Sequence, residues 1–190
     1  VVGPGLGNED TTANFIEKLL NGEQTTHPTP SFGFLSAQAD AKQGEKAHLP
    51  PLVIDADGLR LMARIKNWPA LLPPGSILTP HPGEMSALTG LDVDQIQGNR
   101  LEVARRYANE WNTVVILKGA LTVIAAPDGR AYIIPVATSA LAKAGSGDVL
   151  AGMVGGLLAQ GRPALEAAIA GAWTHAQAGL EAAEKLGSTA

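Results

Sequence analysis

The sequence predicts an α/β fold, a three-layer α/β/α sandwich with a mostly parallel sheet and a C-terminal antiparallel hairpin. Short aliphatic or β-branched runs repeatedly end in polar turns and lead into helical patterns, an alternation that is typical of parallel strands. After Lys118 the alternation stops, and two short runs flank the turn Pro127-Asp128-Gly129, as in a hairpin. The length of 190 residues, 45% of them hydrophobic, is enough for one domain with a sizeable core.

The predicted elements follow one another along the chain. Strands are expected at residues 1–2, 52–54, 76–78, 113–117, 121–125 and 131–134. Helices are expected at about residues 12–20, 59–65, 84–89, 100–111 and 163–185, and one more begins after Gly147. Residues 25–50 are rich in Thr, Pro, Ser, Gln and charge, which predicts a surface insertion. Because "VVGPGLG" resembles the end of a strand, we expect residues 1–190 to form a single domain that lacks its N-terminal part.

Composition and charge exclude several classes of function. With 18 acids against 14 bases and a net charge of -4, the chain has no electrostatic footprint for nucleic acid or an anionic membrane. The absence of cysteine excludes disulfides, thiolate zinc sites and cysteine nucleophiles. The longest apolar run, residues 149–159, is short of the roughly 20 residues that span a bilayer. No signal segment opens the chain, so we expect a cytoplasmic protein that acts on a small molecule.

The candidate functional residues cluster where predicted strands end. Ligands of open α/β sheets bind outside the carboxyl ends of the strands. Five clusters fall at such ends or beside them: the turn of residues 3–7, Asp55 with Asp57, His81, Lys118, and the turn that begins at Gly145. The first of these turns has three glycines that would let a ligand approach the backbone, although an ordinary strand-to-helix turn explains them equally.

The turn Gly145-Ser146-Gly147 precedes an apolar helix and predicts an anion site, because backbone N–H groups point outward at a helix N-terminus. The turn lacks the Lys-Ser/Thr of a phosphate-binding P-loop and the third glycine of a dinucleotide fingerprint. Apolar residues recur with helical spacing, so we expect the helix to be buried, with Gly152 and Gly156 allowing close packing. Asp148, the lone acid, either complements the helix dipole or has a chemical role.

Lys118 and His81 are the other strong candidates. Lys118 ends an apolar strand, where an unpaired charge would be costly, and a bound phosphate would explain it. His81 lies between Pro80 and Pro82, so its backbone is rigid, which suits either substrate placement or a structural role.

The two acids after the strand at residues 52–54 leave more alternatives open. Asp55 and Asp57 could hold Mg²⁺ through waters or position a polar substrate. For Asp57 a helix cap is the preferred interpretation, while the role of Asp55 stays open. The remaining histidines, His27, His48 and His175, are interpreted as inert.

Five motifs in this order carry a resemblance: "GPGLG", "IDADGL", "LTPHPGEMSALTG", "ILKGALTVIAAPDG" and "LAKAGSGDVLAGMVGGLLAQG". Together they resemble the ADP/ATP-dependent NAD(P)H-hydrate dehydratases of the ribokinase-like superfamily. The resemblance covers nearly the whole chain outside residues 25–50. It implies a ribokinase-like fold and an enzyme that repairs hydrated NADH or NADPH (NADHX, NADPHX). ADP or ATP would phosphorylate the ring hydroxyl, and loss of phosphate would restore the double bond.

The resemblance also implies roles for single residues. The nucleotide would be bound by Lys118, Gly119, Ala120, Leu121, Thr122, Gly145, Ser146 and Gly147. Asp148 would accept the hydroxyl proton and contact the hydrate, and Gly5 and His81 would line the hydrate pocket. Mg²⁺ would accompany the diphosphate, although the sequence suggests no ligand set for it. A carboxylate of Asp148 that faced bulk solvent, remote from the rim of the sheet and from Lys118, would contradict this hypothesis.

Two alternatives remain open. The chain could be another ribokinase-like kinase, acting on a hydroxymethylpyrimidine or hydroxyethylthiazole, which would share Asp148 without needing the His81 loop. It could also be a nucleotide-binding or scaffold module without catalysis. The glycine-rich helix favours close packing between subunits, and we expect a homo-oligomer such as a tetramer.

Overall fold

The computed structural model describes residues 1–22 and 49–187. The predicted insertion at residues 25–50 therefore lies outside the described residues, apart from its last two positions. None of the described helices is long and apolar enough to cross a membrane.

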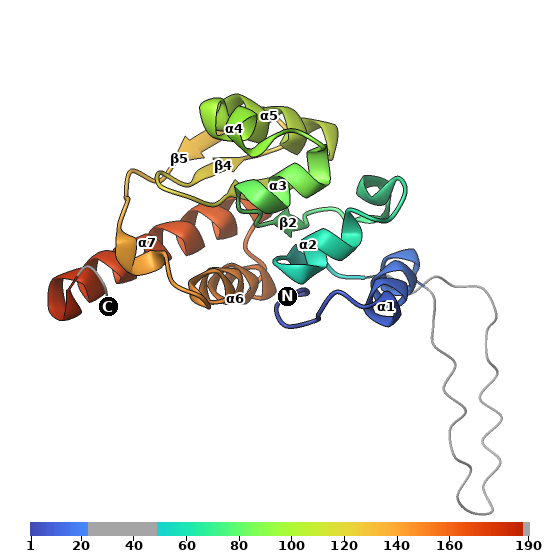
Figure 1. Ribbon diagram of the computed structural model, residues 1–190, viewed down its shortest axis with the longest axis horizontal. Helices are drawn as coiled ribbons and strands as arrows, with labels where there is room; N and C mark the ends of the chain where they lie inside the picture. Colours follow the sequence, from blue (N-terminus) through green and yellow to red (C-terminus); the bar gives the residue numbers. More distant parts are fainter. Residues whose placement is uncertain (23–48, 188–190) are drawn as a thin grey trace, which may run out of the picture.

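The described residues form a five-stranded sheet with its strands in chain order. The sheet lies between the helices at the centre of the molecule (Figure 1). The strands are β1 (Val53–Ile54), β2 (Ile77–Leu78), β3 (Val114–Leu117), β4 (Val123–Ala125) and β5 (Ala131–Ile133). Strands β1, β2 and β3 are parallel, whereas β3, β4 and β5 pair antiparallel. The predicted hairpin is confirmed. The sheet is mixed rather than mostly parallel, because the hairpin extends it from β3.

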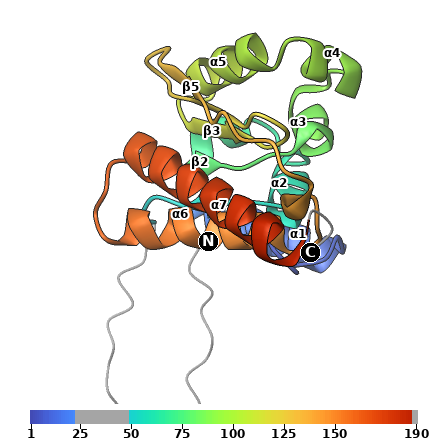
Figure 2. The ribbon, with the colours of Figure 1, turned by 90° about the vertical axis from the view of Figure 1, so that its left-hand side faces the viewer.

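Helices cover both faces of the sheet (Figures 1 and 2). On one face lie α1 (Asp10–Asn21), α2 (Asp57–Met62), α3 (Pro82–Thr89), α4 (Val93–Gly98) and α5 (Arg100–Glu110). On the other face α6 (Ser146–Ala159) and α7 (Ala164–Leu186) pack against each other. Two 3-10 turns, η1 (Trp68–Leu71) and η2 (Ser139–Leu141), lie in the connections.

Two apolar cores follow from the alternation of side chains along each strand. Val115 and Leu117 of β3 belong to the core under α1–α5, while Val114 and Ile116 belong to the core under α6 and α7. A strand that is buried on both faces must be apolar throughout, which explains why the run at residues 114–117 has no polar residue.

Helix α6 departs from the prediction that it is buried. Leu150, Ala151 and Val154 pack toward the sheet, but Val149 is 52% exposed. Gly152 and Gly156 are not sites of close packing, because a Cβ at either position would have no atom within 4 Å. The described part of the chain therefore covers only one side of this apolar helix.

Candidate functional site

A cavity of about 760 Å³ opens beside the ends of β2 and β3. Its apolar wall is formed by Ile134, Val136, Leu141, Leu150, Ala172 and Ala176. Its polar wall includes His81, Lys118, Lys143, Ser146 and His175. Among the described residues that line the cavity there is no aspartate or glutamate, although the chain as a whole has a net charge of -4. The cavity thus favours an anionic ligand with an apolar part.

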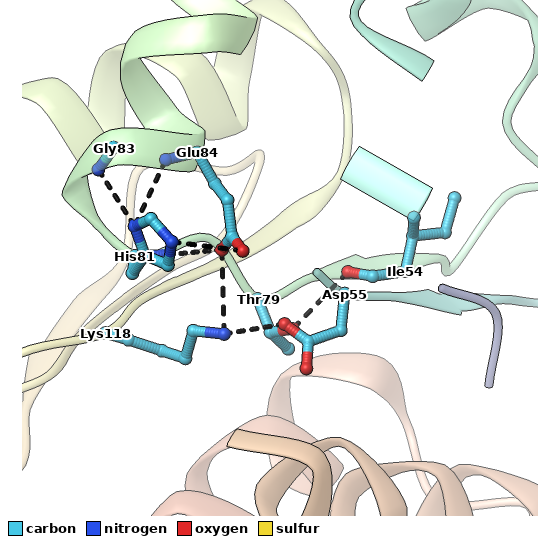
Figure 3. A network of polar contacts seen from close by, with 7 residues as sticks. All are labelled: Ile54, Asp55, Thr79, His81, Gly83, Glu84 and Lys118. Carbon is cyan, nitrogen blue, oxygen red and sulfur yellow. Dashed lines mark hydrogen bonds and ion pairs between the residues drawn. The ribbon is translucent and has the colours of Figure 1, made fainter. Parts of the chain in front are cut away.

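Lys118 is held by two buried carboxylates (Figure 3). Its Nζ lies 2.6 Å from Oδ1 of Asp55 and 3.6 Å from Oε2 of Glu84. Asp55 is fully buried at the end of β1, and Glu84 is 3% exposed in the first turn of α3. The charge of Lys118 therefore has protein partners, so a phosphate is not needed to explain it.

Asp55 faces α6 with its second oxygen. Oδ2 of Asp55 is buried and has no hydrogen-bond partner among the described residues. A Cβ built on Gly147 would lie 3.8 Å from this oxygen and 3.3 Å from Nζ of Lys118. The end of β1, the end of β3 and the start of α6 thus meet at one point, and any side chain at position 147 would be directed against the lysine.

His81 caps helix α3. Its Nδ1 accepts hydrogen bonds from the N–H groups of Gly83 at 2.9 Å and Glu84 at 3.2 Å. This assigns the ring proton to Nε2, which lies 3.2 Å from Oε1 of Glu84. Burial lowers the pKa of His81, and Lys118 lowers it further against the opposing effect of Glu84. His81 is therefore a neutral cap that also lines the cavity, which combines the two interpretations that the sequence left open.

The start of α6 leaves donors available. Gly145 adopts a left-handed conformation with φ of 86°, and none of the described side chains caps the helix. The N–H of Ser146 bonds to the carbonyl of Lys143 at 3.2 Å. Because the first N–H groups of a helix have no partner within it, those of Gly147 and Asp148 can serve a ligand. Ser146 and Gly147 line the cavity, whereas Gly145 does not.

The turn after β3 is supported from behind by Arg100. The guanidinium donates to the carbonyl of Leu117 at 2.9 Å, and a Cβ on Gly119 would overlap it. Of the predicted nucleotide-binding residues in this turn, Gly119, Ala120 and Thr122 line the cavity, while Leu121 is 49% exposed and does not. Arg100 is a site residue that sequence reasoning missed, because nothing in its local pattern links it to the turn.

Asp148 does not line the cavity. It is exposed, and no hydrogen bond or ion pair within the described residues involves its carboxylate. One residue along a helix turns the side chain by about 100°, so Asp148 points away from the side that Gly147 presents to Lys118. The carboxylate therefore faces solvent, but it is not remote from the rim of the sheet, because its neighbour Gly147 lies against Lys118.

The glycine turn of residues 3–7 lies beside the end of β1. The N–H of Asp55 bonds to the carbonyl of Val2 at 3.0 Å, and the N–H of Gly7 bonds to Oδ2 of Asp57 at 3.0 Å. Ala56, not Asp57, is the N-cap residue of α2, so the predicted capping role of Asp57 is wrong. Asp57 instead joins the glycine turn to α2, and Gly5 at the tip of the turn is exposed.

The two aspartates do not form a metal pair, because Asp55 bonds to Lys118 and Asp57 to Gly7. Within residues 1–22 and 49–187, no three His, Asp or Glu side chains gather closely enough to hold a metal ion.

The position of His175 argues against the interpretation of this residue as inert. It lies on α7, lines the cavity, and its Nε2 is 3.2 Å from Oγ of Ser146. Burial lowers the pKa of His175, a hydrogen bond to the backbone of Ser146 opposes this effect, and Lys118 lowers the pKa further. In the sequence His175 stands within a helical pattern of alanines, which gives no signal of a site.

Comparison with known proteins places the chain in a family. A family model described as NAD(P)H-hydrate dehydratase matches residues 36–190. The bifunctional NAD(P)H-hydrate repair enzyme Nnr of Moorella thermoacetica is 40% identical over 190 residues, which are 100% of this chain and 31% of that protein. The ADP-dependent (S)-NAD(P)H-hydrate dehydratase of Neisseria meningitidis is 43% identical over 143 residues, 74% of this chain and 48% of that protein. The chain thus spans less than half the length of either relative.

Solved structures share the fold. The ADP/ATP-dependent NAD(P)H-hydrate dehydratase from Bacillus subtilis, co-crystallised with ATP and Mg²⁺, is 29% identical with a TM-score of 0.72 and covers 97% of this chain and 55% of its own. A ribokinase-like superfamily protein from Enterococcus faecalis is 23% identical with a TM-score of 0.71, again over 97% of this chain and 55% of its own, which shows the ribokinase-like fold. Because the family model matches most of its length, the chain belongs to the NAD(P)H-hydrate dehydratase family.

Proposed function

We propose that the protein dehydrates NADH hydrate and NADPH hydrate with ADP or ATP as phosphoryl donor, and that the cavity binds this nucleotide. The observation that carries the proposal is that Lys118 and the uncapped N-terminus of α6 meet beside a cavity whose described lining contains no aspartate or glutamate. Its volume of about 760 Å³ falls within the range of small-molecule sites. The names of the Neisseria and Bacillus relatives, which specify ADP or ATP dependence, point to the same nucleotides.

The two walls of the cavity suit the two parts of a nucleotide. A base would pack against the apolar wall formed by residues such as Ile134, Leu141 and Ala176, and the phosphates would lie toward Lys118 and Gly147. Phosphoryl transfer requires positioning and charge stabilisation more than covalent chemistry. The uncapped N-terminus of α6 and the ammonium of Lys118 supply such stabilisation, because both are in place before the phosphate arrives.

Asp148 would act as the general base at the rim. As the ring hydroxyl of the hydrate attacks the terminal phosphorus, the carboxylate accepts the hydroxyl proton. The bond from phosphorus to the leaving oxygen of the nucleotide breaks. The new phosphate ester then leaves as inorganic phosphate with loss of a ring proton, which restores the double bond. Gly5 and His81 would line the hydrate pocket, on elements that lie next to Asp55.

Mg²⁺ has no protein cage in the described residues, because they lack a cluster of three ligands. The ion would instead accompany the phosphates of the nucleotide. The cytoplasmic location and a homo-oligomer such as a tetramer remain predictions from the sequence.

The test is repair of the substrate. The full-length protein is incubated with NADH hydrate, Mg²⁺ and ADP or ATP, and the absorbance band of reduced nicotinamide is followed. Recovery that requires a nucleotide supports the proposal. ADP binding without recovery would support the non-catalytic module, and recovery without any nucleotide would exclude the phosphorylation mechanism.

A further inference from the structure

The pair formed by His175 and Ser146 joins the two helices that bound the cavity. Ser146 is the first residue of α6, at the start of the proposed phosphate-binding turn, and His175 lies on α7. Oγ of Ser146 and Nε2 of His175 are 3.2 Å apart, and both residues line the cavity. The role of this pair rests on the proposed function, in which the cavity receives the phosphates of a nucleotide.

Three hydrogen-bond arrangements are available to the pair, because the neutral imidazole has two tautomers. When Nε2 carries no proton, the hydroxyl of Ser146 donates to it, and the serine oxygen then presents only lone pairs to the cavity. When Nε2 carries a proton, in the neutral Nε2–H tautomer or in the imidazolium, Nε2–H donates to Oγ, and the hydroxyl proton is free to bond to an anion in the cavity. A phosphate oxygen accepts hydrogen bonds only, so it is repelled by the arrangement in which Nε2 has no proton. Of the other two, the imidazolium adds a positive charge that attracts the phosphate.

The charges around the pair favour protonation of His175 when a polyphosphate binds. The described elements that pack against α7 are α6, η2, β3 and β4. Their ionisable groups near the pair are Lys118, which is paired with Asp55 and Glu84, and Asp148 on α6, which is exposed and does not line the cavity. Lys143 and His81 line the same cavity. Without a ligand, burial and Lys118 lower the pKa of His175 against the opposing hydrogen bond to the backbone of Ser146, which on balance favours the neutral imidazole. An added polyphosphate would reverse this balance, because a nearby negative charge stabilises the imidazolium.

We propose that binding of the nucleotide phosphates is coupled to the uptake of a proton by His175, which fixes Nε2–H toward Oγ of Ser146 and leaves the serine hydroxyl to donate to a phosphate oxygen. His175 is then a positioning residue for the phosphate-binding turn. Nucleotide affinity rises as the pH falls toward the pKa of His175 in the complex, and each unit by which binding raises that pKa corresponds to about a tenfold gain in affinity at low pH.

The test is calorimetric titration of ADP into the full-length protein at several pH values, in two buffers with different ionisation enthalpies. ADP changes its own ionisation in every sample, so the quantity of interest is the difference between variants. We expect the wild type to take up as much as one proton more per bound ADP than His175→Gln, whose side-chain amide donates to Ser146 at every pH. Ser146→Ala should reduce the uptake in the same way, while His81→Asn, which keeps an N-cap oxygen, should retain it.

Equal proton uptake in the wild type and His175→Gln would overturn the coupling while leaving the proposed nucleotide site intact. If His81→Asn lost the proton uptake while His175→Gln kept it, the proton would be assigned to His81, and the proposed coupling to His175 would be overturned. Absence of ADP binding to the wild type would overturn the proposed function together with the coupling. Titration of the His175 ring by NMR in the wild type, with and without ADP, is independent of any variant's folding. An unchanged pKa of this ring would likewise exclude the coupling.

Discussion

At the residue scale, the cluster of Lys118, Asp55 and Glu84 shows how a charge is held at the end of a buried strand. The lysine side chain is 18% exposed, and the side chains of the two acids are 1% and 4% exposed. Buried ion pairs contribute little net stability when complete, but removing one partner leaves an uncompensated charge. The cluster therefore ties structural integrity to the same lysine that is proposed to meet the nucleotide.

Replacing Lys118 with alanine should destabilise the protein as well as weaken ADP binding. We expect the free energy of unfolding to fall by about 3 kcal/mol, because two buried carboxylates lose their cation. Urea unfolding at neutral pH measures this change. Lys185→Ala, which removes an exposed pair with Glu181, is the matched control and should cost no more than about 1 kcal/mol. Equal losses in both variants, or an unchanged ADP affinity in Lys118→Ala, would contradict the assignment.

Asp148→Asn should lower turnover of the hydrate without changing ADP affinity. The carboxylate is exposed and has no partner among the described residues, so stability and ADP affinity should be close to those of the wild type. Turnover of NADH hydrate should fall by about 10²- to 10⁴-fold if Asp148 is the base. Asp10→Asn, an acid in the first turn of α1, is the control and should keep full turnover. Near-normal turnover in Asp148→Asn would remove Asp148 as the base.

At the element scale, α6 and α7 meet through a glycine that the sequence did not single out. A Cβ on Gly171 of α7 would lie 2.6 Å from Cγ2 of Val154 and 3.3 Å from its backbone. The two helices can therefore approach closely at this position, which brings His175 within reach of Ser146 one turn further along α7.

Gly171→Ala should destabilise the protein by about 1–3 kcal/mol, because the added methyl group has no room between the helices. Gly152→Ala on α6 is the matched variant. A Cβ there meets no atom within 4 Å, so alanine should stabilise the helix by about 0.5–1 kcal/mol. Denaturant unfolding of both proteins measures the contrast. The same sign of change in both variants would show that the helices do not pack as described.

At the scale of the whole molecule, two partly buried histidines make stability depend on pH. The pKa values of His81 and His175 are both lowered from 6.5, chiefly by burial. The unfolded chain binds these protons more readily than the folded protein. The stabilisation is therefore fully present above the unfolded value of 6.5 and is lost as the pH falls through it.

We therefore expect the free energy of unfolding to decrease as the pH falls from about 7.5 to about 5.5. The slope should correspond to the uptake of up to two protons when the protein unfolds. His81→Asn should reduce this slope, since asparagine keeps an acceptor at the N-cap and does not titrate. Urea unfolding at several pH values gives the slope. A stability that rises as the pH falls in this range would contradict the assigned direction of both pKa changes.

The alternation of aliphatic runs, polar turns and helical patterns predicted most of this architecture. It located the strands at residues 53–54, 77–78 and 114–117, the hairpin, and the long helix α7, because each pattern reports burial on one or both faces of an element. It missed α4, a six-residue helix, since so short a segment shows little periodicity. The sequence singled out Lys118 and the turn Gly145-Ser146-Gly147, because a lysine that ends an apolar strand and two glycines before an apolar helix are unusual; the binding roles of these residues stay predictions.

What the sequence by itself determined is the set of local elements and the chemistry at their ends, since backbone periodicity and turn residues act over a few positions. Tertiary structure alone decided which partners those ends meet. Asp55 and Lys118 are far apart in the chain, as are Ser146 and His175, and only packing of the sheet and helices brings them within hydrogen-bonding distance. Tertiary structure also decided that Asp148 faces solvent while Gly147 faces the lysine, because the rotation of α6 about its axis depends on contacts with β1 and α7.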